Sequence, residues 1–216
     1  MRVKICGIRD EEELKICAKY ADAVGFVTEY PADVPWNISR RKARELTSKT
    51  PPFVYTVVVT SGSVEEVIEL VKYTKPNAVQ LHGSESEEEV REIVEAIDVK
   101  VIKALPIDVE TGKVYGRDAV EAALSYEKAG VDAILLDSKT DKVGGTGKTF
   151  NWEVARKVRE KISLPLILAG GLNSKNVRKA VEYVKPYAVD VISGVETGGR
   201  KDERKIKEFV MAAKVI

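Results

Sequence analysis

The chain has 216 residues, and its 35 basic and 34 acidic side chains give a formal net charge of +1. This balance provides no basic field that would favour nucleic acid or a membrane surface. No apolar run approaches the roughly 20 residues that span a bilayer. The length is sufficient for one domain with a full core. We therefore expect a single domain over residues 1–216, with no nucleic-acid partner and no membrane partner.

The cysteine usage indicates a reducing compartment. Cys6 and Cys17 lie in different predicted elements, and two cysteines do not make a disulfide framework. The N-terminal segment has a short apolar core that is followed at once by acidic residues, unlike a signal peptide. We expect a cytoplasmic protein. A charged fraction of 32%, with Gln80 as the only glutamine, also suggests a thermophilic source.

Short β-branched runs alternate with amphipathic stretches along the chain. The runs predict strands at residues 3–8, 23–28, 53–60, 78–83, 100–107, 133–138, 165–172 and 188–196. Most are apolar nearly throughout, as expected for parallel strands that are covered on both faces. The intervening stretches carry apolar residues at i, i+3, i+4 and i+7, which is the helical period. They predict helices near residues 14–21, 40–50, 64–71, 90–97, 116–129, 151–162, 177–184 and 206–213.

Eight strands that alternate with eight helices close naturally into a (β/α)8 TIM barrel. An open doubly wound sheet is the alternative, but no early strand ends in a Gly-rich dinucleotide turn. Active sites of barrels lie at the C-terminal ends of the strands. The strand ends therefore supply the candidate residues: Cys6, Thr28, Thr60, Gln80, His82, Lys103, Asp137, Gly170, Gly171, Asp190, Ser193 and Gly194.

The glycines after the last two predicted strands indicate a phosphate site. Gly170 and Gly171 follow one strand, and Ser193 and Gly194 close the next. Backbone N–H groups can approach an anion closely at such positions, and barrels commonly bind phosphate there. Tight turns would also explain these glycines.

Asp137 and Cys6 are the candidates for proton transfer. Asp137 ends an apolar run, so a partly dry pocket would raise its pKa and make it a general acid, although it could equally cap a turn. A thiol such as Cys6 can act as a base when nearby cations activate it, but a lone strand cysteine more often packs. Cys17 lies on the apolar face of the first predicted helix, and we assign it to the core.

Three other features have less specific interpretations. His82 is the single histidine, and without a Cys/His cluster we expect no metal site. Lys103 could form a Schiff base with a carbonyl substrate, but its side chain could equally face the helices. Residues 144–149 lack the first glycine of the P-loop pattern, so they predict a flexible lid, with Lys148 near the anion, and no nucleoside triphosphate site.

Taken together, these segments resemble the phosphoribosylanthranilate isomerase family. The matching segments are residues 3–8, 23–27, 79–83, 135–139, 144–152, 169–173, 176–177 and 189–196. They follow one another from the first predicted strand to the last, so the combination is far more specific than any one segment.

The resemblance implies a cofactor-free Amadori rearrangement in tryptophan biosynthesis, which converts N-(5′-phosphoribosyl)anthranilate to 1-(o-carboxyphenylamino)-1-deoxyribulose 5-phosphate. Asp137 would protonate the furanose ring oxygen, and Cys6 would remove the proton from C2′. The expected phosphate ligands are Gly170, Gly171, Ser193 and Gly194, and the expected lining of the sugar or aryl side is Gln80, His82 and Asp190. The phosphoribosyl substrate would be the small-molecule partner of a monomer or homodimer.

One loop departs from the family pattern. The family usually carries an arginine after the second strand that pairs with the anthranilate carboxylate, and residues 30–39 contain none. Trp36 could stack on the aryl ring, and Arg9, Arg40 or Arg41 could take over the carboxylate. A changed aryl specificity, another phosphate-binding barrel enzyme of the aldolase or indole-glycerol-phosphate synthase kind, and a non-catalytic phosphosugar-binding module are the alternatives.

Overall fold

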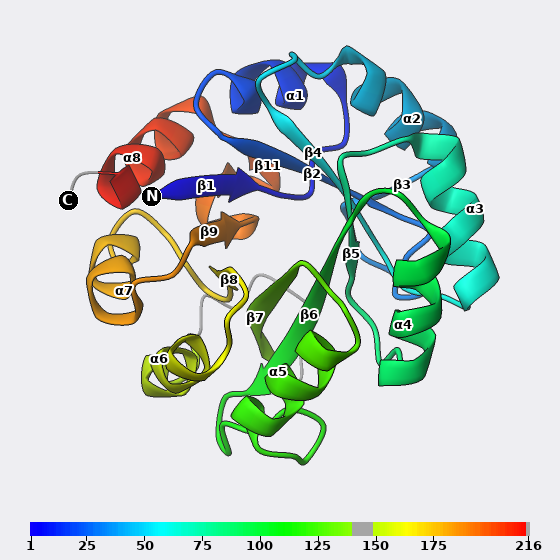
Figure 1. Cartoon of the computed structure of the whole chain (residues 1–216). Helices are drawn as coiled ribbons and strands as arrows, with labels where there is room; N and C mark the ends of the chain where they lie inside the picture. Colours follow the sequence, from blue (N-terminus) through cyan, green and yellow to red (C-terminus); the bar gives the residue numbers. More distant parts are fainter. Residues whose placement is uncertain (140–148, 215–216) are drawn as a thin grey trace.

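The computed structural model describes residues 1–139 and 149–214. Within these ranges, eight parallel strands form a closed barrel with helices around it (Figure 1). The strands are β1 (Arg2–Ile5), β2 (Ala23–Thr28), β4 (Tyr55–Thr60), β5 (Ala78–Leu81), β6 (Lys100–Asp108), β7 (Ala133–Lys139), β8 (Leu166–Leu168) and β9 (Ala188–Val191). Because β1 pairs with both β9 and β2, the sheet has no open edge between its first and last strands. The predicted barrel is confirmed, and the open sheet is excluded.

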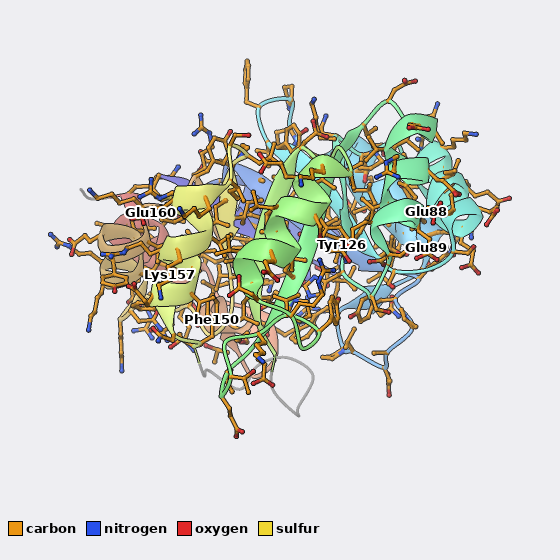
Figure 2. The ribbon with its side chains drawn as sticks, turned by 60° about the horizontal axis from the view of Figure 1, so that its bottom comes forward. Glu88, Glu89, Tyr126, Phe150, Lys157 and Glu160 are labelled. Atoms are coloured by element: carbon orange, nitrogen blue, oxygen red, sulfur yellow. The ribbon has the colours of Figure 1, made fainter. Side chains whose placement is uncertain are left out.

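Helices follow the strands in alternation. They are α1 (Glu11–Ala18), α2 (Arg40–Lys49), α3 (Val64–Thr74), α4 (Glu87–Ala96), α5 (Ala119–Lys128), α6 (Trp152–Lys161), α7 (Val177–Val184) and α8 (Glu203–Lys214). Capping boxes fix the starts of α3 and α4, where Ser63 pairs with Glu66 and Ser86 with Glu89. Charged side chains such as Glu88, Glu89, Lys157 and Glu160 cover the outside of this helix ring (Figure 2). In the described ranges, no helix has both the length and the apolar character needed to cross a membrane.

Several predicted strands are longer than the observed ones. The first, seventh and eighth end at Ile5, Leu168 and Val191. Gly7 and Gly170 have φ angles of +75° and +84°, which turn the chain out of the sheet, and a 3₁₀ turn, η1 (Ser193–Val195), follows β9. The two-residue strands β3 (Asn37–Ile38), β10 (Glu196–Thr197) and β11 (Arg200–Lys201) were not predicted, because two residues show no alternation.

The strands separate two layers of buried side chains. One layer, which includes Val3, Ile5 and Phe26, packs against the helices. The other fills the lumen of the barrel and includes Cys6 and Val27. Because successive side chains point to opposite faces of a strand, apolar residues at almost every position serve both layers.

Candidate active site

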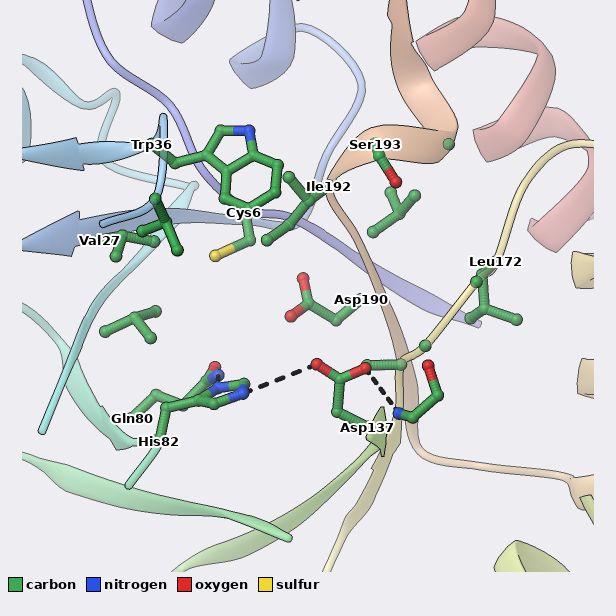
Figure 3. Close-up of a pocket in the computed structure, with 18 of the residues that line it drawn as sticks. Cys6, Val27, Trp36, Gln80, His82, Asp137, Leu172, Asp190, Ile192 and Ser193 are labelled. Carbon is green, nitrogen blue, oxygen red and sulfur yellow. Dashed lines mark hydrogen bonds and ion pairs between the residues drawn. The ribbon is translucent and has the colours of Figure 1, made fainter. Parts of the chain in front are cut away.

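A pocket opens at the C-terminal end of the barrel (Figure 3). All the residues predicted to act on or bind a substrate line it: Cys6, Gln80, His82, Asp137, Gly170, Gly171, Asp190, Ser193 and Gly194. The barrel therefore brings together side chains from both ends of the sequence.

Three other strand candidates lie outside the pocket lining. Thr28 and Thr60 are buried next to Val27 and Val59, which line the pocket, so alternation turns the two threonines toward the helices. Lys103 donates hydrogen bonds to Glu85 Oε2 and to the Gly83 carbonyl, both at 2.7 Å. Burial lowers the pKa of Lys103, but the lysine faces the helix layer and is not placed to form a Schiff base in this pocket.

Asp137 projects from β7 into the pocket. The Ser138 N–H donates to Asp137 Oδ1 at 2.8 Å, and Asp137 Oδ2 lies 3.6 Å from His82 Nε2. Burial raises the pKa of Asp137 to about 6, and the charge of Asp190 adds to this effect. A fraction of the carboxyl group is therefore protonated near neutral pH, as a general acid requires.

His82 is neutral in this setting. Burial, together with the positive charges of Lys103 and Lys4, lowers its pKa to about 4. The Gln80 side-chain amide lies 2.9 Å from His82 Nδ1 and donates to it, which leaves the proton on Nε2, toward Asp137. The 3.6 Å contact is therefore a neutral polar contact and not an ion pair.

Two buried acceptors in the pocket lining have no partner among the described residues. They are Gln80 Oε1 and Asp190 Oδ1. Asp190 points into the space between Cys6 and Asp137 (Figure 3). Because leaving a buried acceptor unpaired is costly, both atoms suit hydrogen-bond donors of a bound molecule, such as hydroxyl groups.

Cys6 comes directly after β1, and its backbone N–H continues the ladder by donating to the Val191 carbonyl at 2.9 Å. Gly25 on β2 makes room for the thiol, because a Cβ there would lie 2.6 Å from Cys6 Sγ. Burial raises the pKa of Cys6, and Asp190 adds to the rise, whereas Lys4 and Lys201 oppose it. The thiolate therefore depends on nearby cations.

The glycine turns after β8 and β9 lie side by side, because these strands are neighbours. A Cβ on Gly170 would lie 2.5 Å from the Ser138 nitrogen, and a Cβ on Gly194 would lie 2.0 Å from the Leu172 carbonyl oxygen. Only glycine fits such close backbone approaches. The turns place the backbone of both loops against the pocket, as a phosphate site requires.

The loop after β2 folds back over the pocket. Tyr30, Val34 and Trp36 line the pocket, and no role was predicted for the first two. Trp36 packs on Gly7, where a Cβ would lie 2.8 Å from Trp36 Cδ1, and its indole N–H donates to Glu196 Oε1 at 3.0 Å. Tyr30, Val34 and Trp36 therefore offer an apolar surface to a planar ring.

None of the three proposed replacements for the missing arginine lines the pocket. Arg9 pairs with Glu13 at 2.8 Å, Arg40 pairs with Glu29 at 2.5 Å, and Arg41 is exposed. Lys148 and the rest of the predicted lid, apart from Thr149, lie outside the described residues. Among the residues that are described, no group of three His, Cys, Asp or Glu side chains is arranged to hold a metal ion.

The model of the N-(5′-phosphoribosyl)anthranilate (PRA) isomerase family matches residues 3–212. The chain belongs to this family. The PRA isomerase of Methanocaldococcus jannaschii is 41% identical, with 100% of this chain and 98% of the relative covered. The PRA isomerase of Thermotoga petrophila is 45% identical, with 99% of this chain and 98% of the relative covered. The chain therefore isomerises N-(5′-phosphoribosyl)anthranilate. This reaction is an aldose-to-ketose rearrangement of tryptophan biosynthesis.

Solved PRA isomerase structures superpose along the whole chain. The Thermotoga maritima enzyme has a TM-score of 0.85 at 42% identity, with 99% of this chain and 98% of that chain covered. A PRA isomerase in complex with reduced 1-(o-carboxyphenylamino)-1-deoxyribulose 5-phosphate has a TM-score of 0.81 at 39% identity, with the same coverage. Both have the barrel architecture that is found here.

Proposed function

We propose that Asp137 is the general acid and Cys6 the general base of the isomerisation. The observation that carries this proposal is their shared pocket, which Asp137 enters from β7 and Cys6 from the end of β1 (Figure 3). Asp190 projects between them, so a sugar that is bound against Asp190 would have the acid on one side and the base on another.

The two groups divide the reaction into two proton transfers. Asp137 gives its proton to the furanose ring oxygen, the C1′–O bond breaks, and the nitrogen lone pair forms an iminium at C1′. Cys6 then removes the proton from C2′, and the released electron pair neutralises the iminium as an enolamine. The enolamine tautomerises to the 2-ketone when C1′ gains a proton and the C2′ hydroxyl loses one, so the overall change is an isomerisation.

The other pocket residues would hold the substrate in this orientation. Gly170, Gly171, Ser193 and Gly194 bind the phosphate through their loops. The unpaired acceptors of Gln80 and Asp190 take hydrogen bonds from sugar hydroxyl groups. His82 presents its Nε2 proton beside Asp137, and the aryl ring lies against Trp36.

The direct test of these roles is turnover of freshly generated anthranilate ribotide, followed by fluorescence. We expect Asp137→Asn to lower kcat by a factor of about 10² to 10⁴, the usual contribution of general acid catalysis. Asp132→Asn is the matched control, since Asp132 binds Lys100 and the Val101 N–H and does not line the pocket. Full activity of Asp137→Asn would remove Asp137 from the mechanism.

We also propose that the enzyme is one domain and works in the cytoplasm of a thermophile. The two cysteines are free and buried, which suits a reducing compartment. A melting midpoint in the ordinary mesophile range would contradict the thermophilic source.

We propose further that the protein is a homodimer. A Thermotoga maritima relative is described as dimeric, at 38% identity and a TM-score of 0.82. Here Phe53, at the N-terminal end of the barrel, is 97% exposed, beside a hollow that Tyr55 and Tyr187 also line. Light scattering should give a dimer for the native chain and for Tyr73→Ser, an exposed aromatic on α3, but a monomer for Phe53→Ser. A monomeric native protein would contradict the proposal.

A further inference from the structure

Lys4 is a buried charge that the roles above leave unexplained. It lies within β1, directly opposite Asp190 on β9, and its ammonium donates to Asp190 Oδ2 at 2.7 Å. The two side chains are only 4% and 7% exposed. Burying two charges is expensive even when they are paired, so the position needs a reason beyond stability.

The Lys4 side chain enters the lumen of the barrel, as the side chains of Cys6 and Asp190 do. Lys4 precedes Cys6 by two residues on the same inward face of the barrel. Lys4 does not line the active-site pocket, and it reaches instead the hollow at the N-terminal end. It therefore lies beneath Cys6 and Asp190, where it can act on them and does not meet the substrate.

We propose that Lys4 is a positioning residue that prepares Cys6 and Asp190 for the reaction. Its ammonium holds Asp190 by Oδ2, which leaves Oδ1 free for the substrate, and it supplies the positive charge that faces the Cys6 thiolate. The functional meaning of this inference rests on the proposed role of Cys6 as the base.

Lys4 is the main source of positive charge among the groups that face Cys6. The others are Asp190 on β9, Lys201 on β11, Asp137 on β7, and the neutral His82 after β5. Lys201 has a weaker influence on Cys6 than Lys4 has, and its ammonium donates to Glu196 Oε1 at 2.8 Å and to the Ile192 carbonyl. Asp137 and Asp190 are acidic, so neither can stabilise a thiolate.

The fold supplies a matched control for Lys4. Lys103 forms the same kind of pair with Glu85, also at 2.7 Å, and these side chains are 0% and 3% exposed. This pair faces the helices and is not among the groups that act on Cys6. Lys103→Met should therefore reproduce the general damage of losing a buried lysine without its electrostatic effect on the thiol.

The test measures the rate at which iodoacetamide alkylates Cys6 as a function of pH, with the modified peptide identified by mass spectrometry. We expect Lys4→Met to move the midpoint of this profile up by about one pH unit or more, which lowers the rate at pH 8 about tenfold. Lys103→Met should leave the midpoint in place. An unchanged midpoint in Lys4→Met, or an equal rise in Lys103→Met, would overturn the proposal.

Asp190→Asn provides a second test that does not require Lys4→Met to fold. Removing the carboxylate takes away a negative charge that opposes the thiolate and leaves the Lys4 ammonium unpaired beside the thiol, so the midpoint should fall. A purely structural role for the pair would disturb the site in the same direction in both variants. A midpoint that stays or rises in Asp190→Asn would also overturn the proposal.

Failure of this inference can be told apart from failure of the catalytic assignment. Alkylation needs no substrate, so it reports on Lys4 whether or not Cys6 is the base. If Lys4→Met leaves the alkylation profile unchanged while Cys6→Ala loses activity, the proposed role of Lys4 is rejected and that of Cys6 stands. If Lys4→Met shifts the profile while Cys6→Ala keeps full activity, Lys4 still acts on the thiol, but this effect has no part in catalysis.

Discussion

The lumen of the barrel and the layer between the barrel and its helices contain the same set of buried groups. The lumen holds Cys6 and the Lys4–Asp190 pair, and the helix layer holds Cys17 and the Lys103–Glu85 pair. Both cysteines are at most 2% exposed. Burial raises the pKa of both thiols, to about 12 for Cys17.

What differs between the two layers is access and neighbours. The lumen groups meet a pocket that can admit a ligand, and the Lys4 charge lies beside the Cys6 thiol. In the helix layer, the Lys103–Glu85 pair does not line that pocket, and the Lys103 ammonium donates to Glu85 and to the Gly83 carbonyl. Residue type and burial therefore do not distinguish the two layers, whereas access to the pocket does.

The lysine pairs give the largest expected effect on stability. Lys4→Met and Lys103→Met each leave a carboxylate buried without its partner, so each should lower the free energy of unfolding by about 3–5 kcal/mol. Urea unfolding at pH 7 measures this loss. Only the lumen variant should also shift the Cys6 alkylation profile. Losses that differ widely between the two variants would show that the pairs are not equivalent.

Removing a carboxylate charge from each layer should change the free energy of unfolding at pH 8 in opposite directions. The pKa of Asp137 is raised from 3.8 to about 6, so the folded state loses stability as pH rises between these values and does not regain it above them. Asp137→Asn should therefore raise the free energy of unfolding at pH 8 by at most about 2 kcal/mol, because solvent screens the exposed part of the side chain. At pH 4 the substitution should change the free energy of unfolding little.

Glu85→Gln is the helix-layer counterpart, and it should lose stability at pH 8 because it leaves the buried Lys103 ammonium unpaired. Thermal melts at pH 4 and pH 8 compare the two variants. A fall in the melting temperature of Asp137→Asn at pH 8 would contradict the raised pKa.

The glycine turns that we propose to bind phosphate should give the smallest of these effects. Alanine at Gly194 would place a Cβ 2.0 Å from the Leu172 carbonyl oxygen and move the loop. We expect inorganic phosphate to bind about tenfold more weakly, a cost within the usual range for overpacking. Gly62→Ala is the control, because its Cβ would meet only the side chain of Glu66, which caps α3 and does not line the pocket. Calorimetric titration that gives native affinity in Gly194→Ala would contradict the assignment.

The sequence predicted the alternation of strands and helices because burial on both faces leaves a strong signal. It misplaced the ends of β8 and β9, since Gly170 and η1 turn the chain while the residues remain apolar. It also placed Thr28, Thr60 and Lys103 at the site. In strands that are apolar throughout, alternation does not reveal which face a polar residue takes, and only closure of the barrel decides this.

The predicted site residues line one pocket because barrels gather strand ends at one rim. Tyr30 and Val34 were missed because the path of a long loop cannot be read from its residues. Lys4 was missed although a signal existed, since a lysine inside a strand that is apolar on both faces must be buried and therefore paired.

The most direct test of the account compares the two cysteines in one assay. Cys6→Ala and Cys17→Ala remove similar buried thiols, from the lumen and from the helix layer. Turnover of anthranilate ribotide should fall by a factor of about 10² to 10⁴ in Cys6→Ala, the size of a general-base contribution. Cys17→Ala should keep native kcat with a modest loss of stability. Native turnover in Cys6→Ala would contradict the assignment of the lumen cysteine as the base.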